Sequence, residues 1–236
     1  GESLRGLLGR VEERRESEWT HRLEEWKKDR APLRAFDRKG LSPRFVMEEA
    51  AARAGEEAFV ATDVGQHQMW TAQFWPFTGP RRFASSGGLG TMGFGLGAAM
   101  GMQLGNPEAR VVLVTGDGSF RMNMNELATV ANYGLPIIIL LMNNGTLGMV
   151  RQWQTMFYQR RYSQTSLDRG PDFQKLAAAF GIESWKAENE DGLRSALDAA
   201  FARRAPALIE VKIDIDETVL PMVPAGKPIA DQIIEA

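Results

Sequence analysis

The segment VVLVTGDGSFRMN, residues 111–123, decides the fold prediction. Four apolar residues and a threonine lead directly into Gly116-Asp117-Gly118, after which the chain becomes polar. A continuous apolar run of this kind is typical of a strand buried on both faces, where a charged side chain is unexpected. Asp117 therefore either belongs to a tight turn at the end of the strand or serves as a ligand for a metal ion.

A second polar pair, Asn143-Asn144, follows the next apolar run, IIILLM at 137–142. Asn144 lies 27 positions after Asp117, and the helical pattern MNELATVANY at 124–133 separates the two runs. A strand, a helix and a parallel strand form a right-handed crossover that brings both strand ends to one edge of a sheet. A carboxylate and an amide oxygen at that edge favour Mg²⁺. The alternative is a capping Asp and an unrelated Asn-Asn-Gly turn.

Both glycines of the first motif favour an anion site beside this metal. Gly116 and Gly118 lack side chains, so the backbone can approach a diphosphate closely. We expect the next helix to begin near Met122, where its N-terminal dipole would add attraction for an anion.

Strands and helices alternate along most of the chain. Ser42-Pro43 opens a helix through Arg53, because serine is a common N-cap and proline fits the first helical position. Continuous apolar strands between helices predict an α/β fold with a doubly wound, mostly parallel sheet and helices on both faces. The segment 153–170 lacks periodicity and is expected to be a long loop or a broken helix. The other expected strands are 58–63, a weak one at 81–85, 111–115 and 207–213, and the other expected helices are 94–103, 172–180 and 191–203.

The first 40 residues differ from the rest, because basic and acidic residues are interleaved there. We interpret residues 1–40 as a charged amphipathic helical lead-in or linker, rather than a basic nucleic-acid arm, and residues 41–236 as the main domain. The chain opens with Gly1 and is charged from the start, so we expect an expressed fragment or a processed piece. The apolar residues at helical spacing are Leu4, Leu7, Leu8, Val11, Trp19, Leu23 and Trp26.

Composition excludes several classes of function. The chain has 236 residues and a formal net charge of −2, so no bulk positive field points to nucleic acid. There are no cysteines, and His21 and His67 are the only histidines, so a metal ion would be bound mainly by oxygen. The longest apolar run, 135–142, is far shorter than the ~20 residues of a membrane helix, and no signal-peptide pattern opens the chain.

The segment GLGTMG, residues 88–93, matches the dinucleotide pattern G-x-G-x-x-G. Dinucleotide binding requires an acidic residue at the end of the next strand, about 20 residues further on. Glu108 lies at that distance but precedes the strand, and Asp117 is more distant and flanked by glycines. The missing acidic residue argues against nicotinamide binding.

Five motifs, in this order, resemble one enzyme family. They are VGQHQMW at 64–70, SGGLGTMGFGLGAAMG at 86–101, the GDG and NN pair, GMVRQWQ at 148–154 and PMVPAG at 221–226. The GDG and NN pair resembles the diphosphate-binding motif of thiamine diphosphate enzymes. From about Leu41 to the end, the whole set resembles the catalytic subunit of acetohydroxyacid synthase (acetolactate synthase), and implies its C-terminal thiamine diphosphate-binding domain.

The resemblance also implies roles for particular residues. Asp117, Asn144 and the main-chain carbonyl of Thr146 would hold Mg²⁺, and Met92 would lie under the cofactor and bend it. Without the resemblance, His67 is equally well a buried structural histidine, and Met92 a core residue. The implied cofactor-binding residues are Val64, Gly65, Gln66, His67, Gly90, Met92, Gly116, Asp117, Gly118, Ser119, Asn144, Thr146, Leu147, Gly148 and Met149.

The family decarboxylates pyruvate and joins the two-carbon unit to pyruvate or 2-ketobutyrate, for branched-chain amino-acid biosynthesis. The resemblance implies that Met149, Val150 and Trp153 shape the pocket for the second keto acid; from the residues alone, Trp153 would anchor a loop. The rivals are another thiamine diphosphate carboligase or decarboxylase, such as glyoxylate carboligase, and a non-catalytic cofactor-binding subunit.

The family's general acid is a glutamate of an upstream domain that is not in this chain, so no catalytic residue is expected here. Glu126 follows the GDG turn and is expected to cap or solvate its helix instead. FAD of the full-length family would be bound mostly outside this chain. The resemblance further implies a homo-oligomer (dimer or tetramer) and a regulatory small subunit, without nucleic acid or membrane, in the bacterial cytoplasm or a eukaryotic chloroplast or mitochondrion.

Overall fold

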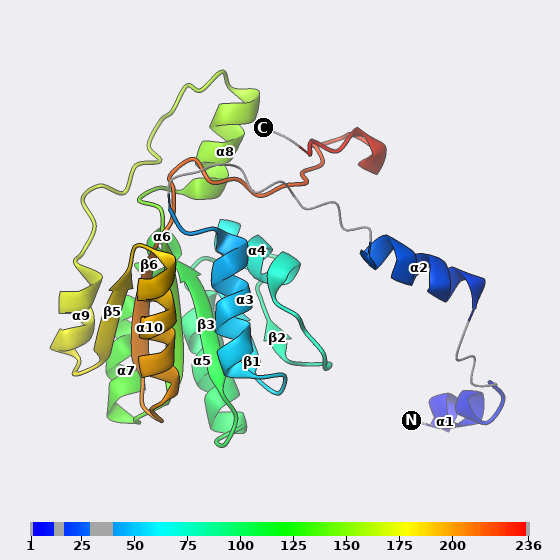
Figure 1. Ribbon diagram of the computed structural model, residues 1–236, viewed down its shortest axis with the longest axis horizontal. Coiled ribbons are helices and arrows are strands. Elements are labelled where there is room, and N and C mark those ends of the chain that lie inside the picture. The colour runs from blue at the N-terminus through cyan, green and yellow to red at the C-terminus, as the bar shows by residue number, and fades with distance from the viewer. Residues whose placement is uncertain (1, 12–16, 29–39, 235–236) are drawn as a thin grey trace. The chain divides into compact units, whose positions relative to one another are not determined.

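Figure 1 shows the computed structural model of the chain, which describes residues 2–11, 17–28 and 40–234. The chain divides into two compact units, Gly1–Phe36 and Asp37–Ala236. The described part of the first unit contains the helices α1 (Glu2–Leu8) and α2 (Glu18–Lys28). The expected domain boundary at residue 40 adjoins residues outside the described part, so that boundary and the linker role stay predictions.

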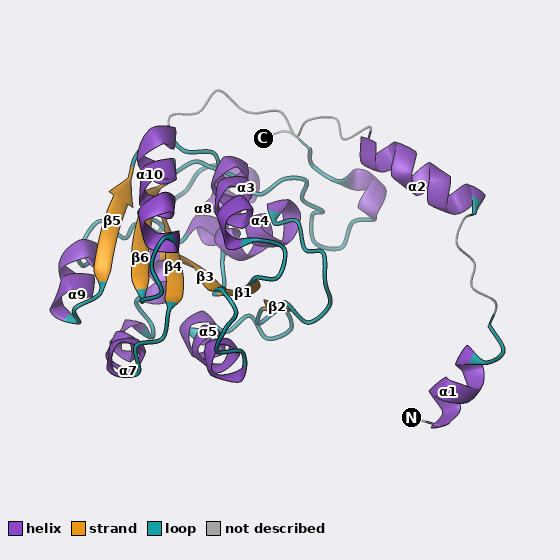
Figure 2. Ribbon diagram, turned by 60° about the horizontal axis from the view of Figure 1, so that its bottom comes forward, coloured by secondary structure: helices purple, strands orange, loops and turns teal. Residues whose placement is uncertain are grey.

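A six-stranded sheet forms the centre of the described part of the second unit, and all of its strand pairs are parallel. Its strand order is β2-β1-β3-β4-β6-β5. Helices cover both faces (Figure 2), so the predicted doubly wound α/β fold is confirmed. The strands are β1 (Phe59–Thr62), β2 (Phe83–Ala84), β3 (Val111–Gly116), β4 (Ile137–Asn143), β5 (Glu183–Ala187) and β6 (Ala207–Lys212).

The sheet separates two apolar cores, each of which is covered by helices. The helices are α3 (Pro43–Ala54), α4 (Gln66–Phe74), α5 (Phe94–Gly105), α6 (Asp117–Phe120), α7 (Leu127–Asn132), α8 (Gly148–Phe157), α9 (Phe173–Ala179) and α10 (Glu190–Phe201), with the 3₁₀ turns η1 (Met124–Glu126) and η2 (Ile229–Asp231). On β3, Val112 and Val114 belong to the core shared with α3 and α10, whereas Val111 and Leu113 belong to the core shared with α5 and α7. Successive side chains of a strand point to opposite faces, which explains why the buried strands are apolar at every position.

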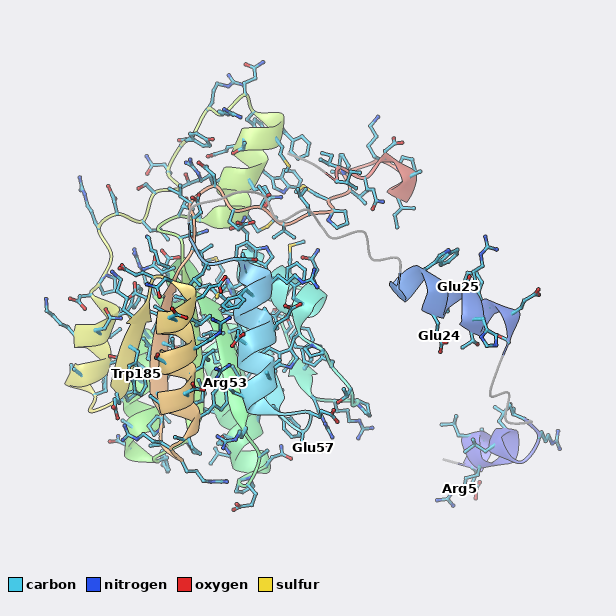
Figure 3. All side chains as sticks on the ribbon, in the orientation of Figure 1. Arg5, Glu24, Glu25, Arg53, Glu57 and Trp185 are labelled. Carbon is cyan, nitrogen blue, oxygen red and sulfur yellow. The ribbon has the colours of Figure 1, made fainter. Side chains whose placement is uncertain are left out.

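Arg53 of α3 joins this helix to α10 on one face of the sheet (Figure 3). It pairs with Asp198 of α10 at 2.6 Å and with Glu49 of its own helix at 2.7 Å. Asp198 is mostly exposed, and exposed ion pairs stabilise a fold only weakly. The two helices are therefore held mainly by buried apolar side chains such as Leu193 and Leu197.

The element boundaries depart from the sequence-based expectation in several places. The helices α4 and α8 and the strand β5 are additional, and the segment 153–170 begins with the last residues of α8 before it becomes a loop. The helix that was expected to begin near Met122 begins at Met124, as the 3₁₀ turn η1 that continues into α7, and α6 before it was not expected. The extended backbone of Gly116 ends β3, and the short helix α6 begins immediately, at Asp117. Within the described residues, no helix has both the length and the apolar character needed to cross a membrane.

Candidate functional site

A cavity of about 220 Å³ lies at the carboxyl ends of β1, β3 and β4. After β2 the chain returns to the other side of β1 to form β3, so the winding direction changes between these strands. Ligands of open α/β sheets bind outside the strand ends at such a switch point. The lining residues are Val64, Gly65, Gln66, His67, Gln68, Met69, Trp70, Met92, Gly116, Asp117, Gly118, Ser119, Met142, Asn144, Thr146, Leu147, Gly148, Met149 and Val150.

Asp117 is the buried acid of this cavity, with 2% of its surface exposed. The parallel register matches Gly116 of β3 with Met142 of β4, so Asp117 and Asn144 follow neighbouring strand ends, as predicted. Burial raises the pKa of the Asp117 carboxyl to about 6, although Arg121 and nearby backbone amides act in the opposite direction. Its Oδ2 is buried and has no hydrogen-bond partner among the described residues. A buried carboxylate oxygen without a partner is costly, so this position suits a bound cation.

His67 of α4 is buried in the wall of the same cavity. A Cβ atom on Gly116 would come within 2.7 Å of His67 Nδ1, and one on Gly65 within 2.9 Å of its Cε1. The imidazole therefore occupies space that two glycines leave open. Burial lowers the pKa of His67 to about 4, against the opposing effect of Asp63, so the ring is neutral near pH 7. Its Nε2 is buried and lacks a hydrogen-bond partner within the described part of the chain.

Asn144 is oriented by a chain of side-chain amides. Its Nδ2 donates to Gln66 Oε1 (3.1 Å), and its Oδ1 accepts from the backbone amide of Thr146 (3.2 Å). Gln66 Nε2 donates in turn to Gln152 Oε1 (3.0 Å) and to the carbonyl oxygen of Glu217 (2.7 Å). Both hydrogens of the Gln66 amide are therefore used within the protein, and Gln66 acts here by orienting Asn144.

Two more glycines keep the cavity open. A Cβ atom on Gly148 would lie 1.9 Å from Gln66 Oε1 and 2.8 Å from Asn144 Nδ2. A Cβ atom on Gly118 would lie 2.9 Å from Leu147 Cδ2. Side chains at these positions would displace the residues that shape the cavity, which explains why glycine stands there.

The segments that line this cavity all belong to a region of the chain that matches one domain family. Residues 63–211 match the family described as thiamine pyrophosphate enzyme, C-terminal TPP binding domain. The chain belongs to this family. The matched region extends from Asp63, directly after β1, into β6, so it includes the cavity-lining residues that follow β1, β3 and β4. The cofactor of this domain family is thiamine pyrophosphate, which is also called thiamine diphosphate.

The chain is also similar to several acetolactate synthase large subunits. It is 43% identical over 216 residues to the acetolactate synthase large subunit of Pyropia yezoensis, covering 91% of this chain and 36% of the relative. It is 45% identical over 209 residues to the acetolactate synthase isozyme 2 large subunit of Escherichia coli (strain K12), covering 86% of this chain and 38% of the relative. The corresponding protein of Haemophilus influenzae is 42% identical over 219 residues, covering 92% and 38%. The chain thus spans little more than a third of the length of these relatives.

The structure brings nearly all of the predicted cofactor residues of the thiamine pyrophosphate enzyme domain together. Every one of them lines the cavity except Gly90. Gly90 has a φ of +70° and lies in the loop before α5, where an added Cβ would be 3.9 Å from Val64. Gly90 therefore shapes this loop rather than the cavity wall. Contact of these residues with the cofactor stays a prediction.

The predicted substrate residues line a second, larger hollow of about 690 Å³. Met149 and Val150 line both spaces, so the hollow adjoins the first cavity. Trp153 is 40% exposed on α8 and contacts Phe157 edge to face, with 5.3 Å between ring centroids. The hollow is lined by Met149, Val150, Trp153, Gln154, Tyr158 and Arg161.

Sequence patterns missed several polar residues that support the site. Asp63 and Gln152 are buried, and each bonds to segments that lie far from it in the sequence. Asn143 Oδ1 accepts from the amide of Gly145 (3.0 Å), and Asn143 is itself bonded to the buried Glu210 of β6. For Asp63, Asn143 and Glu210 the available signal was a polar residue at a strand end or within a strand, and for Gln152 a polar residue in a helix, and neither signal identifies the partners.

Glu126 lies away from both spaces, at the N-terminal end of α7. Its carboxylate accepts from Thr129 Oγ1 (2.7 Å) and Asn125 Nδ2 (3.0 Å), so it bonds to its own helical segment as expected. In the described part of the chain, no group of three or more acidic or histidine side chains is arranged to hold a metal ion. The predicted Mg²⁺ ligands are a different set: one carboxylate, one amide and one main-chain carbonyl.

Proposed function

We propose that the cavity binds the diphosphate of thiamine diphosphate together with Mg²⁺, and that the chain supplies this part of an acetolactate synthase active site. The observation that carries the proposal is a pair of unpartnered buried atoms, Asp117 Oδ2 and His67 Nε2, in a cavity kept open by glycines. A carboxylate oxygen attracts a cation, and the imidazole Nε2 can donate to a phosphate oxygen in the protonation state that places a hydrogen on this nitrogen. The two atoms therefore suit a metal ion and a diphosphate side by side.

The donor set fits a hard divalent cation. Asp117 Oδ2, Asn144 Oδ1 and the carbonyl of Thr146 would provide protein oxygens, and Mg²⁺ usually completes its shell with phosphate oxygens and water. The backbone amides of Gly118 and Ser119, at the start of α6, would bond to the diphosphate. Met92 lines the same cavity and would support the bound cofactor from below.

The lining of the adjoining hollow suits a 2-keto acid as substrate. Its lining combines apolar side chains, such as Val150 and Trp153, with the cation Arg161, whose charge is opposite to that of a keto acid carboxylate. Thiamine diphosphate, when bound, supplies the electron sink for decarboxylation of such an acid. The relatives are named as acetolactate synthases, and the resemblance implies decarboxylation of pyruvate and transfer of its two-carbon unit to a second 2-keto acid.

Titration calorimetry tests this proposal on the 236-residue chain. We expect thiamine diphosphate to bind in the presence of Mg²⁺, and its affinity to fall when EDTA removes the metal. The Asp117→Ala variant should lose at least about tenfold in affinity, because it removes a direct ligand. Asp191→Ala is a matched control, since the Asp191 side chain is 96% exposed on α10.

Equal binding with and without Mg²⁺, or equal losses in the Asp117 and Asp191 variants, would contradict the proposed metal site. Flavin binding, a homo-oligomer and a regulatory small subunit stay predictions from the resemblance.

A further inference from the structure

Asp63 is a buried carboxylate that follows β1 and does not line the cavity. Only 1% of its surface is exposed. Its Oδ1 accepts from the backbone amides of Gly93 (2.7 Å) and Val64 (3.0 Å), and also from Ser119 Oγ. Its Oδ2 accepts a longer bond from Thr115 Oγ1 (3.4 Å). One oxygen atom thus accepts hydrogen bonds from three donors that are remote from one another in the sequence.

These donors belong to the segments that build the cavity. Val64 begins the turn between β1 and α4, and Gly93 is the N-cap of α5, next to Met92. Ser119 lies in α6, which begins with Asp117. Val64, Met92 and Ser119 all line the cavity. The Asp63 carboxylate is therefore the point at which the turn after β1, the N-terminus of α5 and the segment after β3 are joined.

The packing around Asp63 leaves little freedom for these segments. A Cβ atom on Gly95 of α5 would lie 2.7 Å from the backbone nitrogen of Asp63, so the start of α5 is in close contact with the end of β1. Without the carboxylate, the donors of Gly93 and Ser119 would be buried with no acceptor from this side chain. Buried donors seek other partners, so we expect the loops that carry them to shift.

We propose that Asp63 is a positioning residue, which sets the affinity for thiamine diphosphate and Mg²⁺ by fixing the cavity walls through Gly93, Val64 and Ser119. This inference rests on the proposed function and adds to it a residue without direct contact to the ligand. The role depends on an oxygen acceptor at this place. An asparagine retains that oxygen, and its amide group would face Thr115 Oγ1, which can accept a hydrogen bond.

The test compares Asp63→Ala, Asp63→Asn and Val60→Ala in the full 236-residue chain. Val60 is fully buried on β1 in the apolar core, so Val60→Ala lowers stability while it keeps the Asp63 carboxylate and its three donors. Affinity for thiamine diphosphate with Mg²⁺ is measured by calorimetry, stability by thermal unfolding, and loop order by hydrogen exchange at residues 90–93 and 116–119 without ligand. Supporting side chains around metal sites typically change affinity by about 10- to 100-fold, and we expect a loss in this range for Asp63→Ala. Asp63→Asn should remain close to the unmodified chain, and Val60→Ala should keep its affinity despite its lower unfolding temperature.

Faster hydrogen exchange in both loops should accompany the affinity loss of Asp63→Ala and be absent from Val60→Ala. Should Asp63→Ala not fold, Asp63→Ser carries the same expectation, because the shorter side chain cannot reach all three donors. Equal affinity of the alanine variant and the unmodified chain would overturn the positioning role, and so would a loss in Asp63→Asn as large as in Asp63→Ala. Absence of binding by the unmodified chain itself would instead overturn the proposed function, and the positioning role with it.

Discussion

Burial in the same cavity shifts the pKa values of Asp117 and His67 in opposite directions. Burial favours the protonated carboxylic acid of Asp117 and the neutral imidazole of His67, so both groups are driven toward the uncharged form. A divalent cation reverses this preference for Asp117, because it stabilises the carboxylate. The cavity without ligand is therefore electrostatically unfavourable for the ionised acid, and binding of a cation relieves that cost.

We predict opposite pH dependence of stability in variants of these two residues, measured by denaturant unfolding between pH 4 and 7 in EDTA. The pKa of Asp117 in the folded state, about 6, lies above the ordinary value of 3.8 for an aspartate, so the folded state holds more protons between these values. The Asp117 contribution to stability therefore falls as pH rises through this range. The pKa of His67 in the folded state, about 4, lies below 6.5, so the contribution of His67 rises as pH increases.

Relative to the unmodified chain, Asp117→Asn should thus gain stability with rising pH, and His67→Asn should lose it. Stability curves that run parallel to that of the unmodified chain would show that these groups do not titrate as described.

Gly148 is the glycine whose substitution should affect the site most directly. In Gly148→Ala, the new Cβ would overlap Gln66 Oε1, whose amide is held by Asn144, Gln152 and Glu217. We predict a loss of about 1–3 kcal/mol in the free energy of unfolding, together with weaker cofactor binding. The control is Gly97→Ala in α5, since among the described residues no atom outside its own helical turn lies within 4 Å of the added Cβ.

Gly97→Ala should stabilise the helix by about 0.5–1 kcal/mol. Similar unfolding free energies for the two alanine variants would show that a side chain at position 148 does not collide with Gln66.

Single site residues could be predicted from the sequence where their spacing along the chain indicated that they lie close together in the fold. Asp117 and Asn144 could be paired because a strand, a helix and a strand place them at one sheet edge. Asp63 could not be identified in this way, because its partners Gly93 and Ser119 come from two other segments. Tertiary packing, rather than the local sequence pattern, determines which donors form hydrogen bonds with one carboxylate.

At the scale of elements, α4 and α8 together hold a backbone segment near the C-terminus. Side chains of the two helices donate to the carbonyl groups of residues 217–220. Gln152 bonds to both the amide and the carbonyl of Val219, at 2.9 Å each, and it also accepts from Gln66. The network that orients Asn144 therefore continues into this segment. The donors are Gln66, Trp70, Gln73 and Gln152.

We predict that Gln152→Ala increases hydrogen exchange at residues 217–222 by at least about tenfold, because losing a buried amide pair costs roughly 1–3 kcal/mol. Gln154→Ala is the matched control on the same helix, since its hydrogen bonds to Ser163 are exposed. Protection of 217–222 that is unchanged in Gln152→Ala would contradict the role of this glutamine.

The elements that escaped prediction share weak local signals. The strand β5 reads ESWKA and has a single buried residue, because it is the edge of the sheet and lacks the apolar run of β3 or β4. The helix α4 buries polar residues, Gln66 and His67, that an amphipathic pattern would place in solvent. The buried strands and the helices α3, α5 and α10 were predictable, because their apolar residues cover a core that the pattern itself describes.

At the scale of the whole molecule, the chain carries the metal and diphosphate side of the proposed active site. It spans little more than a third of the length of the acetolactate synthase large subunits it resembles. The resemblance assigns the general acid to an upstream domain, and the described residues of the cavity offer no second carboxylate in its lining. The proposed function therefore implies that catalysis requires groups beyond those of this cavity.

We predict that the 236-residue chain alone forms no acetolactate from pyruvate, and that activity appears when the upstream domain of a relative, which carries the general acid, is supplied. In the reconstituted enzyme, Trp153→Ala should change the ratio of products from pyruvate and 2-ketobutyrate more than it changes cofactor affinity. Trp185→Ala, on β5 and packed against the core, is the control and should leave that ratio unchanged. Parallel loss of cofactor affinity and product ratio in Trp153→Ala would argue against a substrate-pocket role.

In the proposed site, Asp117 and Asn144 hold a divalent cation at the ends of β3 and β4. The most direct test of this site is an anomalous difference map from crystals of the chain grown with thiamine diphosphate and Mn²⁺, an ion that suits the same oxygen ligands as Mg²⁺. We expect one strong peak at coordination distance, about 2.1 Å for Mg²⁺, from Asp117 Oδ2, Asn144 Oδ1 and the Thr146 carbonyl. Bound thiamine diphosphate with no peak there, or with the metal on other ligands, would contradict the proposed site.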